Sequence, residues 1–404
     1  MVRGARHSSA IAPPGSLAGF MSDSRRARRT RARTRRRIVV SFVVALLFVG
    51  GAATAGAVLR AHDTRKGQAP RTTTTASTIT TATTLGPTTT TRGPLGSGQP
   101  VSFAFGGDVH FEGGLRPKLL AAPDRVLAPI TPILSSADVA VVNLETAVTD
   151  GGTPERKQYV FRAPPVALTA LAAAGVDTAT LANNHGLDYG PQGLADTLAA
   201  EQTTGFHLIG VGRDANEAFT PHRMVVNGQR IAILAATQVV DDQLVDSWTA
   251  TDQHGGLASA RNPDRLLASV RAARADSDTV VVYMHWGVEE QECPTDTQKT
   301  LAQQLVDAGA DIVVGSHAHR QQGAGHLGDA FVDYGLGNFV FYNQEGTAGV
   351  TGVLQVTATG RQISSYHWVP AQIRGGVPQP LDGAAAERAG AAWNDLRGCS
   401  GLAA

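Results

Sequence analysis

The feature that most constrains the fold of this chain is a series of short apolar runs, rich in β-branched residues, that alternate with helical patterns. Strands are expected at residues 101–107, 138–145, 178–183, 230–236, 279–286 and 311–318. Helices are expected between them, at residues 164–175, 191–205, 262–274 and 294–310. This alternation predicts an α/β fold with at least one central sheet. Beyond residue 331 apolar runs follow one another without helices, so part of the sheet should be mixed or antiparallel.

Polar side chains gather at the carboxyl ends of these predicted strands, where open α/β sheets form ligand sites. Imidazole, carboxylate and amide oxygen together suit Zn, Mn or Fe. The residues that supply these groups are Asp108, His110, Glu145, Asn184, His285, His317 and His319. One ion takes roughly four to six ligands, so this set predicts two divalent ions with one bridging carboxylate. Such a pair can activate water for in-line attack on phosphorus.

His185 directly follows a predicted ligand and remains free to protonate a leaving group. The further residues expected around the site, as supports or substrate contacts, are Asn143, Asn183, Asp188, Trp286, Glu289 and Asn338. Taken singly, each cluster has an ordinary explanation, since a histidine on an apolar strand is usually a core residue and an Asn-Asn pair is usually a turn. Five clusters in succession, each at a strand end, favour a shared metal site instead.

Residues 38–59 contain no charge, and at about 1.5 Å per residue a helix over them reaches roughly 33 Å, enough to span a bilayer. Residues 1–37 carry eleven arginines, which predicts a cytoplasmic tail and a body outside the cell by the positive-inside rule. A cleavable signal is the alternative reading of this segment. A basic block can also indicate nucleic-acid binding, but beside a predicted span we expect the membrane, and no nucleic acid, as its partner.

Residues 60–98 are rich in Thr and Pro and are expected to be a disordered linker, because they offer little apolar surface to bury. The folded domain is expected over residues 99–375, with a C-terminal extension over residues 376–404 that packs on it. The chain has two cysteines, Cys293 and Cys399. Outside the cell this pair can persist as a disulfide that ties the extension to the domain, and two buried free thiols are the alternative.

The order of the polar motifs resembles the calcineurin-like metallophosphoesterase superfamily and, within it, the bacterial CapA family associated with capsule and poly-γ-glutamate synthesis. The motifs that carry the resemblance are GDVHFEG, NLETAVTD, YVFRAPP, LANNHGLDYG, HWGVE, GSHAHRQQG and YGLGNFVF. They span about residues 100–370. The resemblance implies a four-layer α-β-β-α sandwich.

The resemblance also assigns roles to particular residues. It implies that Asp108, His110 and His319 hold one metal and that Asn184, His285 and His317 hold the other. Glu145 would bridge the two metals, and His185 would be the catalytic histidine. Glu145 departs from the superfamily pattern, which has Asp there, and ANNH replaces the superfamily's Gly-Asn-His.

Two basic residues in KQYVFRAPP, Lys157 and Arg162, are candidates for contacting an anionic substrate. Exposed charges on a solvated segment are the alternative for both.

The function that the resemblance implies is that of a membrane-anchored, extracytoplasmic protein of capsule or poly-γ-glutamate biosynthesis that hydrolyses a phosphoester or γ-glutamyl bond. A non-catalytic, metal-stabilised scaffold and a general cell-surface phosphoesterase are the alternatives. The expected partners are the membrane through a single span, an acidic polymer or phosphoester substrate, and other capsule-synthesis membrane proteins.

Overall fold

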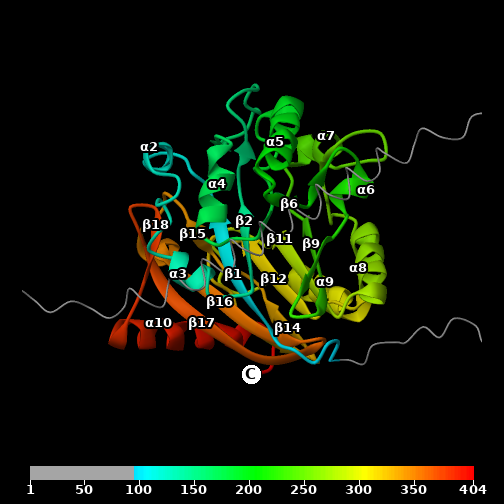
Figure 1. Ribbon diagram of the computed structural model, residues 1–404, viewed down its shortest axis with the longest axis vertical. Coiled ribbons are helices and arrows are strands. Elements are labelled where there is room, and N and C mark those ends of the chain that lie inside the picture. Colours follow the sequence, from blue (N-terminus) through cyan, green and yellow to red (C-terminus); the bar gives the residue numbers. More distant parts are fainter. Residues whose placement is uncertain (1–94) are drawn as a thin grey trace, which may run out of the picture. The chain divides into compact units, whose positions relative to one another are not determined.

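A computed structural model of the protein describes residues 95–404 (Figure 1). The predicted basic tail, the predicted span and most of the predicted linker lie outside the described residues. Within residues 95–404, no helix is both long enough and apolar enough to cross a bilayer. Two β-sheets form the centre of this part of the chain.

The eight-stranded sheet contains both parallel and antiparallel strands. Its order is β18-β17-β16-β1-β2-β5-β6, with β15 paired to β1. Strands β1, β2, β5 and β6 run parallel, whereas β16, β17 and β18 are antiparallel to their neighbours. The bounds are Val101–Val109 (β1), Val139–Leu144 (β2), Thr178–Thr180 (β5), His207–Ile209 (β6), Asn338–Val340 (β15), Val350–Thr359 (β16), Gln362–Arg374 (β17) and Val377–Pro380 (β18). The expected antiparallel region near the end of the chain is therefore confirmed.

The six-stranded sheet has the order β13-β14-β12-β11-β9-β8. Its four inner strands are parallel, and β8 and β13 are antiparallel edge strands. The bounds are His222–Val226 (β8), Gln229–Thr237 (β9), Thr279–Trp286 (β11), Ile312–His317 (β12), Ala324–Leu327 (β13) and Ala330–Asp333 (β14). Two further two-stranded pairs are Ala147–Val148 (β3) with Arg162–Ala163 (β4), and Val211–Gly212 (β7) with Gly256–Leu257 (β10).

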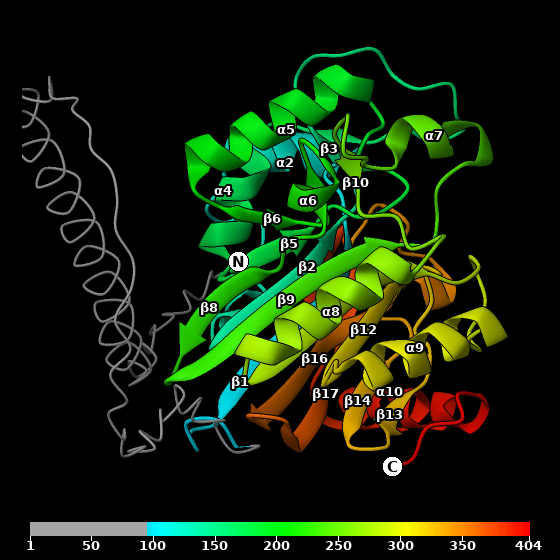
Figure 2. The same cartoon turned by 90° about the vertical axis from the view of Figure 1, so that its right-hand side faces the viewer.

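Alternating side chains on each strand explain how the sheets are layered. In β1, Phe103 and Phe105 enter an apolar core that also contains Val281 of β11, so the two sheets face each other. Ala104 of β1 belongs instead to a core shared with α4 and α5. On the far side of the six-stranded sheet, Val282 of β11 packs with α8 and α9, which cover that face in Figure 2. The described residues thus form an α/β fold with helices on the outer face of each sheet.

The four predicted helices lie where the sequence placed them, whereas the short helices α2, α3, α6 and α7 and the 13-residue helix α10 were not foreseen. The bounds are Leu115–Ala121 (α2), Thr131–Leu134 (α3), Val166–Ala173 (α4), Gly190–Thr204 (α5), Ala215–Ala218 (α6), Val245–Trp248 (α7), Asp264–Asp276 (α8), Asp296–Ala308 (α9) and Gly383–Asp395 (α10). Short 3-10 helices span Asp242–Leu244, Gly346–Gly349 and Leu396–Cys399.

The C-terminal segment packs on both sheets. Trp393 of α10 stacks on Trp368 of β17, with ring centroids 5.4 Å apart and planes within 3°. Ala403 pairs with His326 at the edge strand β13. Cys399 forms a disulfide with Cys293, which lies in the loop after β11. The predicted disulfide is confirmed, and the alternative of two free thiols is wrong.

Candidate metal centre

The two sheets contribute different kinds of donor atom to one cluster of side chains. Asp108 lies in β1 and Glu145 directly follows β2, so the eight-stranded sheet presents carboxylates. Asn184, in the loop after β5, adds an amide oxygen. The six-stranded sheet presents imidazoles, because His285 lies in β11 and His317 ends β12. The parallel strands of both sheets therefore deliver their predicted ligands to the same place.

One group of ligand atoms consists of Glu145, His285 and His317, whose donor atoms lie within 4.8 Å of one another. His285 Nε2 is 3.5 Å from Glu145 Oε1 and 2.7 Å from the Oδ1 atom of Asn184. The rings of His285 and His317 have centroids 4.8 Å apart. These spacings bring one carboxylate, one amide and two imidazoles within reach of a single ion.

A second group consists of Asp108, Glu145 and His319. His319 Nδ1 lies 3.3 Å from Asp108 Oδ2 and 2.8 Å from Asn338 Oδ1. Glu145 belongs to both groups, which is the position expected of a bridging ligand. Its longer side chain, in place of the aspartate expected at this point, still reaches both sets of donors.

Unpaired polar atoms mark the centre of this cluster. Both carboxylate oxygens of Glu145 and Nδ1 of His317 are buried and have no hydrogen-bond partner. A buried polar group without a partner costs about 1–3 kcal/mol, and proteins rarely leave one unsatisfied. Burial, and then the charge of Asp108, hold the pKa of Glu145 well above its usual range. These orphaned atoms fit divalent metal ions, which would satisfy all three.

The electrostatic environment of His319 supports the same interpretation. Burial alone would lower the pKa of His319, but the charges of Glu145 and Asp108 outweigh it and raise the pKa to about 10. The raised pKa reflects the negative charge that these carboxyl groups place around the ring. A metal ion would supply the positive charge that balances them, and it would bind the deprotonated ring nitrogen of His319.

Side-chain amides hold the oxygen donors in place. Asn143 Nδ2 donates to Asp108 Oδ1 at 2.8 Å and lies 3.2 Å from His285 Nδ1. Asn143 Oδ1 in turn accepts from Asn183 Nδ2 at 2.9 Å, and Asn183 Oδ1 accepts from the backbone N–H of His185 at 3.0 Å. All five residues are buried. Asn143 and Asn183 thus act as supports, because they connect two proposed ligands, Asp108 and His285, to His185.

His185 is oriented by a carboxylate. Its Nδ1 lies 2.6 Å from Asp188 Oδ2, and its ring stacks on Phe161 with centroids 4.1 Å apart. The backbone N–H of Phe161 donates to the same Asp188 oxygen at 2.6 Å. Burial raises the pKa of Asp188 to about 7, against the opposing effects of Lys157 and this N–H. With Nδ1 engaged, Nε2 is the ring atom of His185 that is left for proton transfer.

Lys157 is buried rather than exposed, with its side chain 7% accessible. Its Nζ lies 3.0 Å from Asp188 Oδ1 and 3.3 Å from Asp241 Oδ2, and it also donates to the carbonyl oxygen of Asn184. The alternative of a solvated charge is therefore wrong for Lys157. Three protein acceptors surround the ammonium, so its role as a substrate contact is not supported either.

Arg162, the second predicted anion contact, also has protein partners. Its guanidinium lies over the ring of Tyr189 at 5.0 Å and contacts the carbonyl oxygen of Asp150 at 3.5 Å. Its backbone N–H donates to Glu112 Oε1 at 2.9 Å. The side chain is partly exposed, so the prediction that Arg162 contacts substrate stays a prediction.

His110 lies in neither ligand group, in contrast to its predicted role. Its ring stacks on Phe161 and packs edge-on against Phe341, with centroids 4.7 and 4.1 Å away. The backbone N–H of Glu112 donates to His110 Nδ1 at 3.0 Å, and that of Tyr342 points at Nε2 at 3.4 Å. Both ring nitrogens therefore face backbone donors, which is the reason that His110 is absent from the cluster.

Trp286 and Glu289 lie apart from the ligand groups. Trp286 belongs to the core between the six-stranded sheet and its helices, and its Nε1 donates to Tyr334 O at 2.9 Å. It faces away from His285 because neighbouring residues of a strand point to opposite sides. Its side chain therefore does not reach the ligand groups, and its predicted role as a support stays a prediction. Glu289 is exposed in the loop after β11, where its charge raises the pKa of Glu145 further.

Backbone geometry holds the imidazoles, and sequence reasoning did not foresee it. His317 and His319 have φ values of 94° and 52°, in a region that residues other than Gly seldom adopt. Such conformations cluster at functional sites. Sequence reasoning also missed Ser316, whose Oγ lies 3.1 Å from His285 Nδ1, although its place inside GSHAH was a usable signal. Phe161 and Asp241 gave no local signal, because their partners are distant in sequence.

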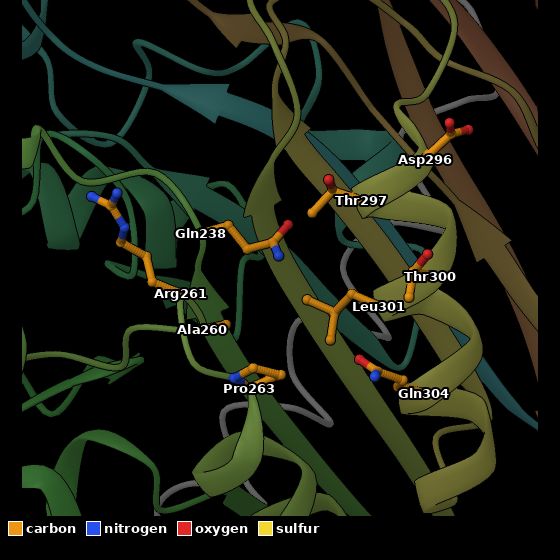
Figure 3. A pocket seen from close by; sticks show the side chains of 9 residues that line it. All are labelled: Gln238, Ala260, Arg261, Pro263, Asp296, Thr297, Thr300, Leu301 and Gln304. Atoms are coloured by element: carbon orange, nitrogen blue, oxygen red, sulfur yellow. The ribbon is translucent and has the colours of Figure 1, made fainter.

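A hollow of about 360 Å³ lies close to this cluster but contains none of its ligands (Figure 3). Its walls include Gln238, Arg261 and the first residues of α9, among them Asp296 and Thr297. The backbone N–H of Gln238 donates to the carbonyl oxygen of His285 at 2.9 Å, so the hollow adjoins the outer side of the strand that carries a ligand. We therefore assign the site to the buried donors rather than to this hollow.

Comparisons with known proteins agree with the motif resemblance. A family model described as "Bacterial capsule synthesis protein PGA_cap" matches residues 102–343. "Capsule biosynthesis protein CapA" of Bacillus anthracis is 32% identical over 272 residues, which cover 65% of this chain and 64% of that protein. "PGA biosynthesis protein CapA" of Bacillus subtilis (strain 168) is 30% identical over 267 residues, covering 64% and 67%. The match thus spans slightly under two thirds of the Bacillus anthracis protein.

Among solved structures, the 5'-nucleotidase from Candida albicans SC5314 aligns with a TM-score of 0.40 and 9% identity, covering 74% of this chain and 58% of that chain. The family model matches more than half of the present chain. The resemblance drawn from the order of the polar motifs is confirmed, and this chain belongs to the family of bacterial capsule synthesis proteins, PGA_cap.

Proposed function

We propose that this protein is a metal-dependent hydrolase of capsule or poly-γ-glutamate biosynthesis, anchored in the membrane with its catalytic domain outside the cell. The observation that carries the proposal is Glu145, whose two buried oxygens lack any hydrogen-bond partner and which lies in both ligand groups. A carboxylate in this state is costly to bury unless it has cationic partners. Metal binding removes that cost and supplies the chemistry.

The chain's own residues have distinct roles in the proposed reaction. Asp108, Asn184, Glu145 and the three histidines His285, His317 and His319 would hold two divalent ions, of which Mn, Fe and Zn suit this mixed donor set. When bound, these ions would activate water and polarise the bond to be cleaved. His185, when protonated on both ring nitrogens, would give its Nε2 proton to the leaving group and become neutral, and Asp188, at 2.6 Å from Nδ1, holds the ring in orientation.

The names of relatives support the biological setting. The Bacillus anthracis and Bacillus subtilis proteins are named for capsule and PGA biosynthesis, respectively. The bond proposed for cleavage is a phosphoester or a γ-glutamyl amide, in an acidic polymer or in a phosphoester that serves its assembly. Other capsule-synthesis membrane proteins are the proposed partners.

The proposed anchor is the uncharged segment 38–59, with residues 1–37 in the cytoplasm. The disulfide between Cys293 and Cys399 supports an oxidising compartment for the folded domain. Fusions of alkaline phosphatase and of a cytoplasmic fluorescent reporter after residue 98 test the orientation. An active phosphatase fusion is the expected result, and reporter fluorescence with an inactive phosphatase would refute the placement.

The first test of function is metal content by elemental analysis of the full chain, with His317→Ala and His254→Ala as variants. His254 is an exposed histidine outside the cluster and serves as the matched control. We expect about two transition metals per chain in wild type and in His254→Ala, and fewer in His317→Ala. Phosphodiesters and γ-glutamyl peptides are then tested as substrates with the same proteins.

A metal-stabilised scaffold without catalysis is the second candidate. The observation in its favour is His110, which lies outside both ligand groups and leaves one predicted ligand position unfilled. Metal binding without turnover of either substrate class, in a protein whose His185→Ala variant still supports the polymer in cells, would make this candidate the better one. Absence of metal in the folded protein after incubation with Mn, Zn and Fe would contradict both.

A further inference from the structure

A single buried ammonium joins two parts of the proposed site. Lys157 lies on the segment between β3 and β4, and its side chain is 7% exposed. Its Nζ contacts Asp188 Oδ1 at 3.0 Å, Asp241 Oδ2 at 3.3 Å and the carbonyl oxygen of Asn184. The ring of Trp248 lies 5.1 Å away and closes the remaining side. A lysine ammonium has three N–H donors, and three protein oxygens lie within hydrogen-bond or ion-pair distance of this one.

The partners of Lys157 show what this ammonium can control. Asp188 holds the Nδ1 atom of His185 at 2.6 Å through its other oxygen. Asn184 presents its side-chain Oδ1 atom to His285 Nε2 at 2.7 Å. Lys157 therefore contacts one residue that orients the proposed acid and one residue that is a proposed metal ligand.

We infer that Lys157 is a positioning residue that fixes His185 through Asp188 and, at the same time, fixes Asn184 through its carbonyl oxygen. The inference rests on the proposed roles of His185 and Asn184 and adds a residue to them. Asp241 brings a third segment into the arrangement, because it follows β9 of the opposite sheet. Lys157 thus ties the loop after β5 to the loop after β9, one from each sheet.

Two other roles for Lys157 fit the structure less well. Contact with an anionic substrate requires room beside Nζ, and three protein oxygens together with the Trp248 ring already surround it. A purely structural ion pair is costly to bury, and replacing such a pair with apolar residues is often neutral or stabilising. Lys157 contacts Asn184 directly and is linked to His185 through Asp188, and these links offer a functional explanation for burying its charge.

The test compares Lys157→Met with Lys118→Met in the full chain. Lys118 is a matched control, since its Nζ also donates to a backbone carbonyl, that of Gly375 at 2.7 Å, on the protein surface. Three quantities are measured: the thermal midpoint, the affinity for metal, and the proton NMR resonance of the His185 Nδ1–H. That resonance is assigned by its loss in His185→Ala. None of these measurements depends on a known substrate.

We expect Lys157→Met to stay folded, to shift or broaden the His185 Nδ1–H resonance, and to bind metal about 10- to 100-fold more weakly than wild type. Lys118→Met should match wild type in all three quantities. An unchanged resonance together with unchanged metal affinity in folded Lys157→Met would overturn the inference. If Lys157→Met does not fold, the milder Asp241→Asn removes one of the two carboxylate charges beside the ammonium, and the same resonance should then move.

Turnover gives a second, independent readout if a substrate is found. With metal in excess, so that weaker binding through Asn184 does not limit turnover, Lys157→Met should lower turnover about 10- to 100-fold in wild type and have little further effect in Asp188→Asn, because both changes then act on His185 by one route. Fully additive losses would contradict this route. Wild-type protein that binds metal but cleaves nothing would refute the proposed hydrolase, whereas the resonance and the metal affinity would still decide the role of Lys157.

Discussion

The two halves of the candidate metal centre are held in place by different means. On the eight-stranded sheet, the oxygen donors are supported by hydrogen bonds between side chains, as Asn143 donates to Asp108 and accepts from Asn183. On the six-stranded sheet, two of the three imidazole donors also depend on an unusual backbone conformation, because His317 and His319 both have positive φ. The first half is fixed by polar side chains that can be replaced one by one, whereas the second also depends on the path of the chain.

This difference indicates how each half should respond to substitution. A support that consists of hydrogen bonds loses one contact at a time, and each loss is local. A support that consists of backbone conformation changes only when the chain itself moves, and it stores strain of about 1–3 kcal/mol at each unusual residue. Substituting a residue that contacts donors of both halves should therefore lower metal content and turnover more than substituting a residue that contacts only one half.

The largest effect is expected for Glu145→Gln, since Glu145 is the described residue that belongs to both ligand groups. We expect loss of both metals and a fall in turnover of about 10⁴-fold, in the range of other removals of central catalytic groups. Elemental analysis and turnover assays check this. Without metal, the variant should be at least as stable as wild type, because an amide replaces a buried carboxyl that has no partner. Full metal content in Glu145→Gln would refute the bridging role.

The next effect is expected for the disulfide, which joins the loop after β11 to the C-terminal segment that packs on both sheets. Its cysteines are 106 residues apart, and closing a loop of that size stabilises by about 4–5 kcal/mol in the chain-entropy model. Cys293→Ser with Cys399→Ser should therefore lower the folding equilibrium constant about 10³-fold. Urea unfolding of both proteins measures the difference. Equal midpoints would show that the packing of Trp393 holds the extension without the bond.

A smaller effect is expected for His185→Ala. This variant removes the proposed proton donor, which lies beside the oxygen donors, and leaves every proposed metal ligand in place. Turnover should fall about 10²-fold, in the range typical of general acids, with metal content unchanged. The comparison with His317→Ala separates chemistry from binding. Loss of metal in His185→Ala would mean that His185 acts as a ligand or as an essential support of Asn184.

The smallest effect concerns Asp333 of β14, a buried carboxyl on the imidazole side whose Oδ2 has no partner. Burial raises the pKa of Asp333 to about 8, although the N–H of Gly335 opposes this. The unfolded chain releases this proton near pH 4 and the folded protein holds it to about pH 8, so the associated stability is complete below pH 4 and is lost as the pH rises to 8.

Asp333→Asn should remove this pH dependence and stabilise the protein at pH 8 by about 1–2 kcal/mol, roughly tenfold in the folding equilibrium. Urea unfolding at pH 5 and pH 8 measures both values, with Asp329→Asn on an exposed turn as the control. A variant whose stability falls with pH as steeply as that of wild type would contradict the assignment.

The sequence predicted the strands that deliver the ligands and the residue types at their ends, because buried strands and their polar ends are encoded locally. The place of Trp286 could also have been read from the two-residue alternation that directs His285 the other way. The direction of the His110 side chain could not be read in this way, since the prediction assumed regular alternation after Asp108. Strand β1 has register irregularities on both sides of Asp108, and these redirect the residues that follow.

Other parts of the site depend on contacts that no local pattern records. Lys157 meets Asn184, Asp188 and Asp241, which lie on two loops from different sheets. His317, one of the two histidines with positive φ, lies where β12 meets Asp108, whose Oδ2 accepts from the backbone N–H of His317 at 3.3 Å. Long-range pairing of this kind is set by the completed fold rather than by spacing along the chain.

The division of donors between the sheets has a consequence for the synthesis of the protein. His317 and Asp108 are 209 residues apart, so a nascent chain that has emerged only through β9 holds every oxygen donor of the centre and none of its imidazole donors. Such a chain has no mixed donor set for a transition ion. In the proposed metal centre, loading would therefore be a late step in biogenesis, and a loaded centre would report that both halves of the polypeptide have been made and have docked.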